Sequence, residues 1–125
     1  FRPKWAYGEI RGGTPPVEHD GKLLRFFHSS LRNEIGPIRH RYYIGAMLMS
    51  DKPPFEVLAV SKRPVIYGSE TDDLTPIQRK DCFHRKQNVV FPGGCIKRDG
   101  HYLLSFGVND AACAVAKITE KELNL

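Results

Sequence analysis

Two residues of this sequence have the type and position to bind a polar ligand, Asp110 and His28. Asp110 follows Gly107-Val108-Asn109 at the end of an apolar stretch. A carboxylate there can accept hydrogen bonds from two adjacent hydroxyl groups, although an Asp beside an Asn also commonly shapes a turn. His28 ends a comparable stretch, Leu23 to His28, and its alternative role is structural, with the ring bonded to backbone. The residue types alone leave both roles open for each side chain.

Two loops rich in glycine and proline precede strand-like stretches, Gly12-Gly13-Thr14-Pro15-Pro16 and Phe91-Pro92-Gly93-Gly94. Glycine lets the backbone approach a ligand closely, and proline fixes the direction of the chain that follows. A tight turn between neighbouring sheets would need the same residues. We predict ligand contacts in these loops at Gly13, Thr14 and Phe91.

Amide and aromatic side chains extend this candidate site. Asn88 precedes the second loop and can aim its amide at the same ligand. Tyr43, Tyr42 and Trp5 offer flat faces on which a ring of a ligand can stack, but such aromatics are equally often part of a core. Because side chains alternate along a strand, Tyr42 and Tyr43 must face opposite ways.

Arg11 is the candidate for binding an anion such as inorganic phosphate. Glu9 lies two residues earlier, and the period of a strand places both side chains on one face. A carboxylate there would repel phosphate, so an Arg11–Glu9 ion pair is at least as plausible. Phosphate binding at Arg11 and an Arg11–Glu9 ion pair are therefore the two alternatives for this residue.

Histidines and cysteines do not form a metal-binding pattern. Cys82, Cys95 and Cys113 have no CxxC spacing, which predicts neither a zinc site nor a disulfide framework. No metal site is therefore expected. Free cysteines favour a reducing, cytoplasmic location. The remaining histidines lie in turns or loops, where we expect solvated side chains: His19, His40, His84 and His101.

An internal repeat sets the fold. Val17 to His28 reappears as Ile96 to Gly107, and each copy has an apolar residue, two polar residues, an Asp-Gly turn and an apolar strand. Asp20-Gly21 and Asp99-Gly100 are typical of type I′ hairpins, because both residues adopt positive φ there. Repeats of this kind are typical of propellers and solenoids.

Strand signals dominate the chain and predict an all-β fold. The expected strands are Leu23–His28, Arg41–Met49, Phe55–Ser61, Val89–Ile96, Tyr102–Val108 and Ala112–Ile118. The only expected helix is a short turn over Thr119–Leu123, capped by Thr119. The blade-like repeats span about 12–66 and 88–118 within a single piece, 1–125, and a polar loop over 68–87 joins them. We predict a partial β-propeller of about two four-stranded antiparallel blades. Each blade must bury both faces of its sheet, so the rest of a propeller or a second copy of the chain must pack against these two blades.

Composition excludes several partner classes. The 125 residues are 41% hydrophobic and 26% charged, with a net charge of +5, as in an ordinary globular domain. Basic residues cluster only at Arg79-Lys80 and His84–Lys86, so we expect no nucleic-acid partner. Apolar runs such as Ala111–Ala116 are too short to cross a membrane. No secretory leader is visible. The sequence opens on Phe1 and not on Met, so a region that precedes Phe1 is not excluded.

Motifs along nearly the whole chain resemble the C-terminal portion of glycoside hydrolase family 130. Six segments occur in the family's order: an Ile-x-Gly-Gly-x-Pro-Pro-Val segment, an aromatic-His strand end, a Tyr-x-x-Gly-Ala strand, an Ala-x-Ser-x-x-Pro-Ile segment, an Asn-Val-Val-Phe-Pro-x-Gly segment and a Gly-x-x-Asp segment. They are Ile10–Val17, Phe27-His28, Tyr42–Ala46, Ala59–Ile66, Asn88–Gly94 and Gly107–Asp110.

The resemblance implies a five-bladed propeller that cleaves β-mannosides by phosphorolysis or hydrolysis, with inorganic phosphate as a co-substrate in the first case and no other cofactor. The family's general acid and its phosphate-binding arginines lie in N-terminal blades, to which nothing here corresponds, so no catalytic residue is assigned. The resemblance implies that Asp110 and His28 contact the sugar. Glu9, however, stands where the phosphorylases have Lys. The alternative is a non-catalytic carbohydrate-binding or scaffold propeller attached to a polysaccharide-processing or glycosyltransferase protein.

Overall fold

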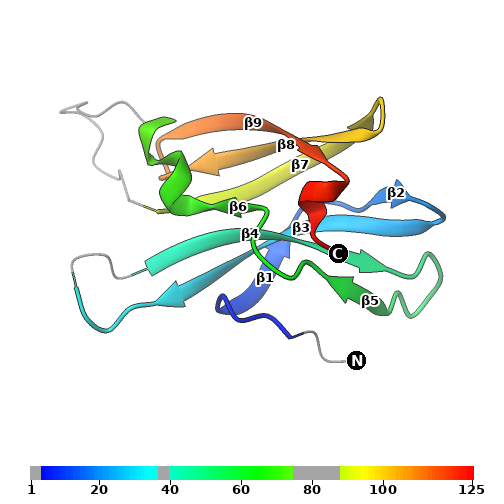
Figure 1. Ribbon diagram of the computed structural model, residues 1–125, viewed down its shortest axis with the longest axis horizontal. Helices are drawn as coiled ribbons and strands as arrows, with labels where there is room; N and C mark the ends of the chain where they lie inside the picture. The colour runs from blue at the N-terminus through cyan, green and yellow to red at the C-terminus, as the bar shows by residue number, and fades with distance from the viewer. Residues whose placement is uncertain (1–3, 37–39, 75–87) are drawn as a thin grey trace.

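The computed structural model describes residues 4–36, 40–74 and 88–125. These residues form two antiparallel β-sheets that stack face to face (Figure 1). Among them, no helix has the length and apolar character needed to cross a membrane.

The first sheet is four strands wide. Strands β1 and β2 lie one after the other along β3, and β5 and β6 do the same along β4. The long β3–β4 pair runs in unbroken register from Leu23–Met49 to Arg32–His40. The strands are β1 (Glu9–Gly13), β2 (Val17–His19), β3 (Lys22–Arg32), β4 (His40–Met49), β5 (Val57–Val60) and β6 (Ile66–Tyr67).

The second sheet contains, in the described part of the chain, three strands in the order β7-β8-β9. They are β7 (Val90–Arg98), β8 (His101–Val108) and β9 (Ala112–Thr119). The register of β7 shifts between Pro92 and Gly94. In the first sheet the corresponding position is the break between β1 and β2. The strands predicted from sequence are thereby confirmed, whereas β1, β2 and β6 were not expected as separate strands.

The two Asp-Gly turns are confirmed. Asp20 and Gly21 have φ of 49° and 72°, and Asp99 and Gly100 have φ of 51° and 75°. Each pair joins two antiparallel strands, β2–β3 and β7–β8. Positive φ at both central residues is what a type I′ turn requires.

The core lies between the sheets because one face of each sheet is apolar. On β8 the alternate residues Tyr102, Leu104, Phe106 and Val108 are buried, and they meet the face of β3 and β4 that carries Phe26. Burial of this shared apolar surface is the main force that holds the two sheets together. The stacked, unclosed sheets form a partial β-propeller, as predicted, but the second sheet has three strands among the described residues where about four were expected.

The opposite face of the first sheet carries an aromatic cluster. Trp5 packs edge-on against Phe27 with ring centroids 5.0 Å apart, and Tyr7 contacts Tyr43 and Tyr67 at 5.2 and 6.4 Å. A Cβ atom at Gly45 would lie 2.8 Å from the Trp5 ring and closer still to the Phe27 ring, so a side chain there would force these rings to shift.

Two short 3₁₀ helices correct the expectation of a single helical turn. Helix η1 (Gly68–Leu74) occupies the start of the expected 68–87 loop, and the remainder of that loop lies outside the described residues. Helix η2 (Lys121–Leu123) confirms the C-terminal turn, but Thr119 does not cap it. Thr119 instead ends β9, paired with His101, and its N–H donates to Glu122 Oε2 at 2.8 Å.

The two cysteines in the described ranges differ in environment, which predicts different reactivity. Burial raises the pKa of the Cys95 thiol to about 11, whereas Cys113 is exposed. Because only the thiolate is nucleophilic, iodoacetamide should modify Cys113 first at pH 8. Peptide mass spectrometry should show Cys95 labelling that rises about tenfold for each pH unit up to that pKa. Equal labelling of the two at pH 8 would contradict the burial of Cys95.

Candidate functional site

His28 is the best-defined polar side chain of the predicted site. It lies on β3, is 4% exposed, and its Nδ1 lies 2.6 Å from the carbonyl oxygen of Gly12 on β1. A carbonyl only accepts hydrogen bonds, so Nδ1–H is the donor and Nε2 carries the lone pair. Burial lowers the pKa of His28 below 6.5, and the charge of Arg11 acts in the same direction, while the Gly12 bond opposes them. The ring is therefore a neutral acceptor at pH 7.

Two aromatic rings flank His28 and come from different sheets. Phe91 on β7 lies with its ring centroid 3.9 Å from that of His28, and half of Phe91 remains exposed. Tyr42 on β4 is nearly parallel to His28, at 6.3 Å and 7°. The site therefore spans the junction of the two sheets, with an apolar ring open to solvent beside a buried imidazole.

Gly13 and Thr14 hold β1 against β3. A Cβ atom at Gly13 would collide with the carbonyl oxygen of Phe26 and lie 2.7 Å from Phe27 Cα, so only glycine fits. Thr14 is fully buried; its N–H donates to Phe26 O at 2.9 Å, and its Oγ1 accepts from Phe26 N–H at 3.0 Å. These contacts fix the Gly12 carbonyl that orients His28.

Arg11 and Glu9 form the ion pair that the sequence suggested. Arg11 Nη2 lies 3.5 Å from Glu9 Oε2, and both side chains are more than half exposed. An exposed pair of this kind contributes about 0–1 kcal/mol to stability. It does, however, direct the Arg11 cation toward a carboxylate.

Asn88 and Asp110 lie beyond Phe91, at one end of the second sheet. Asn88 is 3% exposed with φ of 58°, and its carbonyl accepts from Tyr42 N–H at 2.9 Å. Asp110 is exposed in the β8–β9 turn, where Asn109 and Asp110 both have positive φ. Asn109 is buried and accepts from Val89 N–H at 3.0 Å, which ties the turn to β7. Asp110 lies three residues after Gly107, the strand partner of Phe91.

Tyr43 lies on the face of the first sheet opposite to His28, as alternation predicts. Its ring contacts Tyr7 and Tyr67 at 5.2 and 5.8 Å. Trp5 belongs to the same cluster, and its Nε1–H donates to Ser29 Oγ at 2.8 Å. The structure thus brings His28, Gly13, Thr14, Arg11 and Phe91 together, places Asn88 and Asp110 at the adjoining sheet end, and separates Tyr43 from them.

The expectation that His19 is solvated is wrong. Its side chain is 13% exposed, and Nδ1 is hydrogen-bonded to the hydroxyl of Tyr102. The partners are far apart in the sequence, so no local motif marks the contact. One signal was present, because Glu18 and Lys97 occupy the same position of the two repeats with opposite charge, and they form an ion pair. His40 is exposed as expected, His101 is partly buried at the start of β8, and His84 lies outside the described residues.

Comparison with known proteins identifies the family. The family model for glycoside hydrolase family 130, described as beta-1,4-mannooligosaccharide phosphorylase, matches residues 4–125. The chain belongs to this family. Comparison with curated proteins gives no match.

Solved structures show the same fold in larger proteins. The β-1,2-mannobiose phosphorylase from Listeria innocua, solved with β-1,2-mannobiose, aligns with a TM-score of 0.66 and 22% identity over 97% of this chain and 31% of its own. A glycosyl hydrolase from Bacteroides ovatus aligns with a TM-score of 0.60 and 18% identity over 97% and 33%. The chain therefore spans about a third of the length of the solved proteins that it matches.

The residues around His28 lie within the part of the chain that matches the family 130 model. The family match begins at Lys4 and includes β1, β3 and β7, the strands that carry Gly12, His28 and Phe91. These residues provide a hydrogen-bond acceptor, a flat apolar ring and a close-lying backbone. Such a combination suits a ligand that has both hydroxyl groups and an apolar ring face.

Proposed function

We propose that this family 130 chain forms the sugar-binding side of a propeller that acts on β-mannosides. The observation that carries the proposal is the half-exposed Phe91 ring against His28, whose tautomer is set by Gly12. Nε2 of His28 would accept a hydrogen bond from a sugar hydroxyl, and Phe91 would cover the apolar face of the ring. Asp110 would accept bonds from hydroxyl groups farther along the sugar.

The reaction would be cleavage of the β-mannosidic bond, by phosphate or by water, with the general acid supplied by blades outside this chain. The outer face of the second sheet supports such neighbours, because it leaves Ile96 56% and Val115 69% exposed. We infer that a further blade packs there, and a second copy of the chain is the alternative that sedimentation would reveal. The free thiols of Cys95 and Cys113 support a cytoplasmic location.

The Arg11–Glu9 ion pair favours a second function, carbohydrate binding without catalysis. The pair places a carboxylate beside the cation that phosphate would need. A scaffold or binding propeller attached to a polysaccharide-processing or glycosyltransferase protein would need the sugar contacts but no phosphate site.

Sugar binding tests the main proposal. We expect calorimetric titration with β-1,4- and β-1,2-mannobiose to show that His28→Ala, Phe91→Ala and Asp110→Ala each weaken binding at least about tenfold, equivalent to about 1.4 kcal/mol. The matched controls are His101→Ala and Asp99→Ala, which alter the other end of β8 and should leave the affinity unchanged.

Release of mannose separates the two functions when it is measured, with and without inorganic phosphate, on the protein that carries the remaining blades, because this chain lacks the general acid. Release that requires phosphate supports phosphorolysis. Release in either buffer supports cleavage at this site if Asp110→Ala abolishes it. Binding without release supports the non-catalytic function. If the three site variants bind mannobiose as the wild type does, the site is wrongly placed.

A further inference from the structure

A second polar cluster lies away from His28, where the β2–β3 turn meets the end of β9. We propose that it binds a divalent metal ion of the zinc type. The imidazole of His19 and the carboxylates of Asp20 and Glu120 each offer one ligand atom, and these atoms lie within 4.8 Å of one another. Zinc ligands about 2 Å from the metal are about 3–3.5 Å apart, so small rotations of exposed carboxylates would complete the site.

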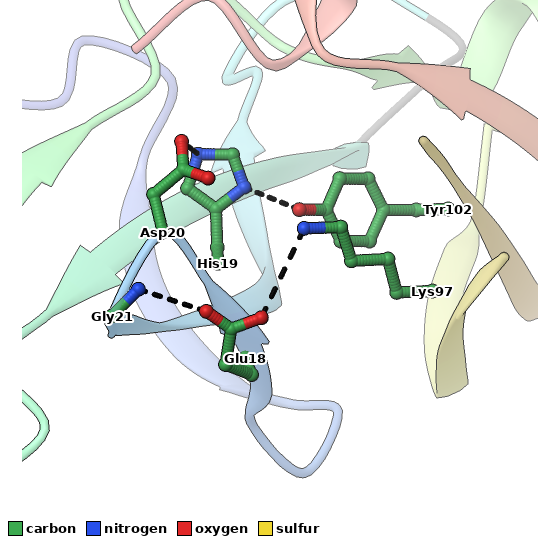
Figure 2. A network of polar contacts seen from close by, with 6 residues as sticks. All are labelled: Glu18, His19, Asp20, Gly21, Lys97 and Tyr102. Atoms are coloured by element: carbon green, nitrogen blue, oxygen red, sulfur yellow. Dashed lines mark hydrogen bonds and ion pairs between the residues drawn. The ribbon is translucent and has the colours of Figure 1, made fainter. Parts of the chain in front are cut away.

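The orientation of His19 is the independent observation that points to a metal. Its Nδ1 is hydrogen-bonded to Tyr102 Oη, which leaves Nε2 facing Asp20 Oδ2 at 3.8 Å (Figure 2). Metal-binding histidines characteristically have the other ring nitrogen held by an outer partner, which fixes the ring and its tautomer. Tyr102 is fully buried and therefore holds the imidazole from a rigid position.

The charges around the cluster favour a cation. Asp20 and Glu120 supply two carboxylates. Lys97, the cation drawn beside the cluster, lies 4.0 Å from Glu18 Oε2, and Glu18 also accepts from Gly21 N–H at 2.8 Å (Figure 2). The Lys97 charge is thus directed at Glu18 and not at the proposed ligands. Imidazole and carboxylate are both zinc ligands, so one imidazole, two carboxylates and a water would complete a tetrahedral site.

The proposed ion would join the two sheets. His19 and Asp20 lie at the end of β2 and in the turn that follows, and Glu120 follows β9 in the second sheet. Since the ligands come from opposite ends of the sequence, no spacing motif reveals them. Binding would stabilise the folded chain in proportion to metal concentration and affinity. This site is independent of the proposed sugar binding.

Titration with zinc chloride tests the proposal on protein without a polyhistidine tag. We expect isothermal calorimetry to give one ion per chain and a zinc-dependent rise in Tm. His19→Ala and Glu120→Gln should each weaken binding more than about tenfold. Tyr102→Phe keeps the ring but loses the bond to His19, and should weaken binding about 10–100-fold. The equivalent turn of the second repeat supplies the matched control, Asp99→Asn, for which we expect unchanged binding.

Glu120 is exposed, so Glu120→Gln keeps the test valid even if His19→Ala fails to fold. Absence of saturable zinc binding would overturn the proposal. Zinc binding that is unchanged in Glu120→Gln and Tyr102→Phe but lost in Cys82→Ser would also overturn it. A stoichiometry of one ion per two chains would do the same.

Discussion

Gly13→Ala should destabilise the protein by about 3 kcal/mol, at the upper end of the usual cost of overpacking. The added Cβ would meet the backbone of Phe26 and Phe27, which cannot move aside as a flexible side chain can. Strand β1 would have to separate from β3, and the Gly12 carbonyl would lose its bond to His28. Urea unfolding followed by Trp5 fluorescence measures the change in the free energy of unfolding.

The neighbouring glycine is the matched control. A Cβ atom at Gly12 would have no atom within 4 Å, so Gly12→Ala should change the free energy of unfolding by less than about 0.5 kcal/mol. Equal stability of the two variants would show that β1 does not approach β3 as closely as described. Comparing sugar binding by the two variants also separates two causes of a loss. Gly13→Ala displaces the backbone, whereas Gly12→Ala only adds a methyl group.

Phe26→Ala should have the largest effect on stability, a loss of about 3–5 kcal/mol. Phe26 is fully buried between the two sheets and contacts Tyr102 edge-on at 6.2 Å. Removing the ring leaves a cavity in the interface that joins the sheets. Because a domain is typically stable by about 5–15 kcal/mol, this one change can remove much of the total. Chemical denaturation with urea gives the difference directly.

Phe55→Ala makes the same substitution at a site that is 43% exposed, and should cost less than about 1 kcal/mol. If the two variants are equally stable, the packing of the sheets does not depend on Phe26. A loss of stability in Phe26→Ala alone would show that the folded chain depends on the interface between the two sheets.

The sequence determined the repeat and most of the strands because these depend on local chemistry. Asp-Gly turns and alternating apolar residues act over a few positions, so Asp20-Gly21, Asp99-Gly100 and β8 were predictable. Alternation also predicted that Tyr42 and Tyr43 point to opposite faces, and period two predicted the Arg11–Glu9 pair. The family motifs, confirmed over residues 4–125, rest on the same local patterns.

Tertiary structure alone decided which of these residues meet. Phe91 reaches His28 only because β7 of the second sheet packs against β3, and His19 reaches Tyr102 across the same junction. The first residue of η1 likewise lies against a residue far along the chain, since a Cβ atom at Gly68 would lie within 2.6 Å of the Asn88 backbone. Turns and alternation follow from forces between neighbours in the chain. Contacts between sheets follow from burying two apolar faces against each other, and that fit exists only in the folded chain.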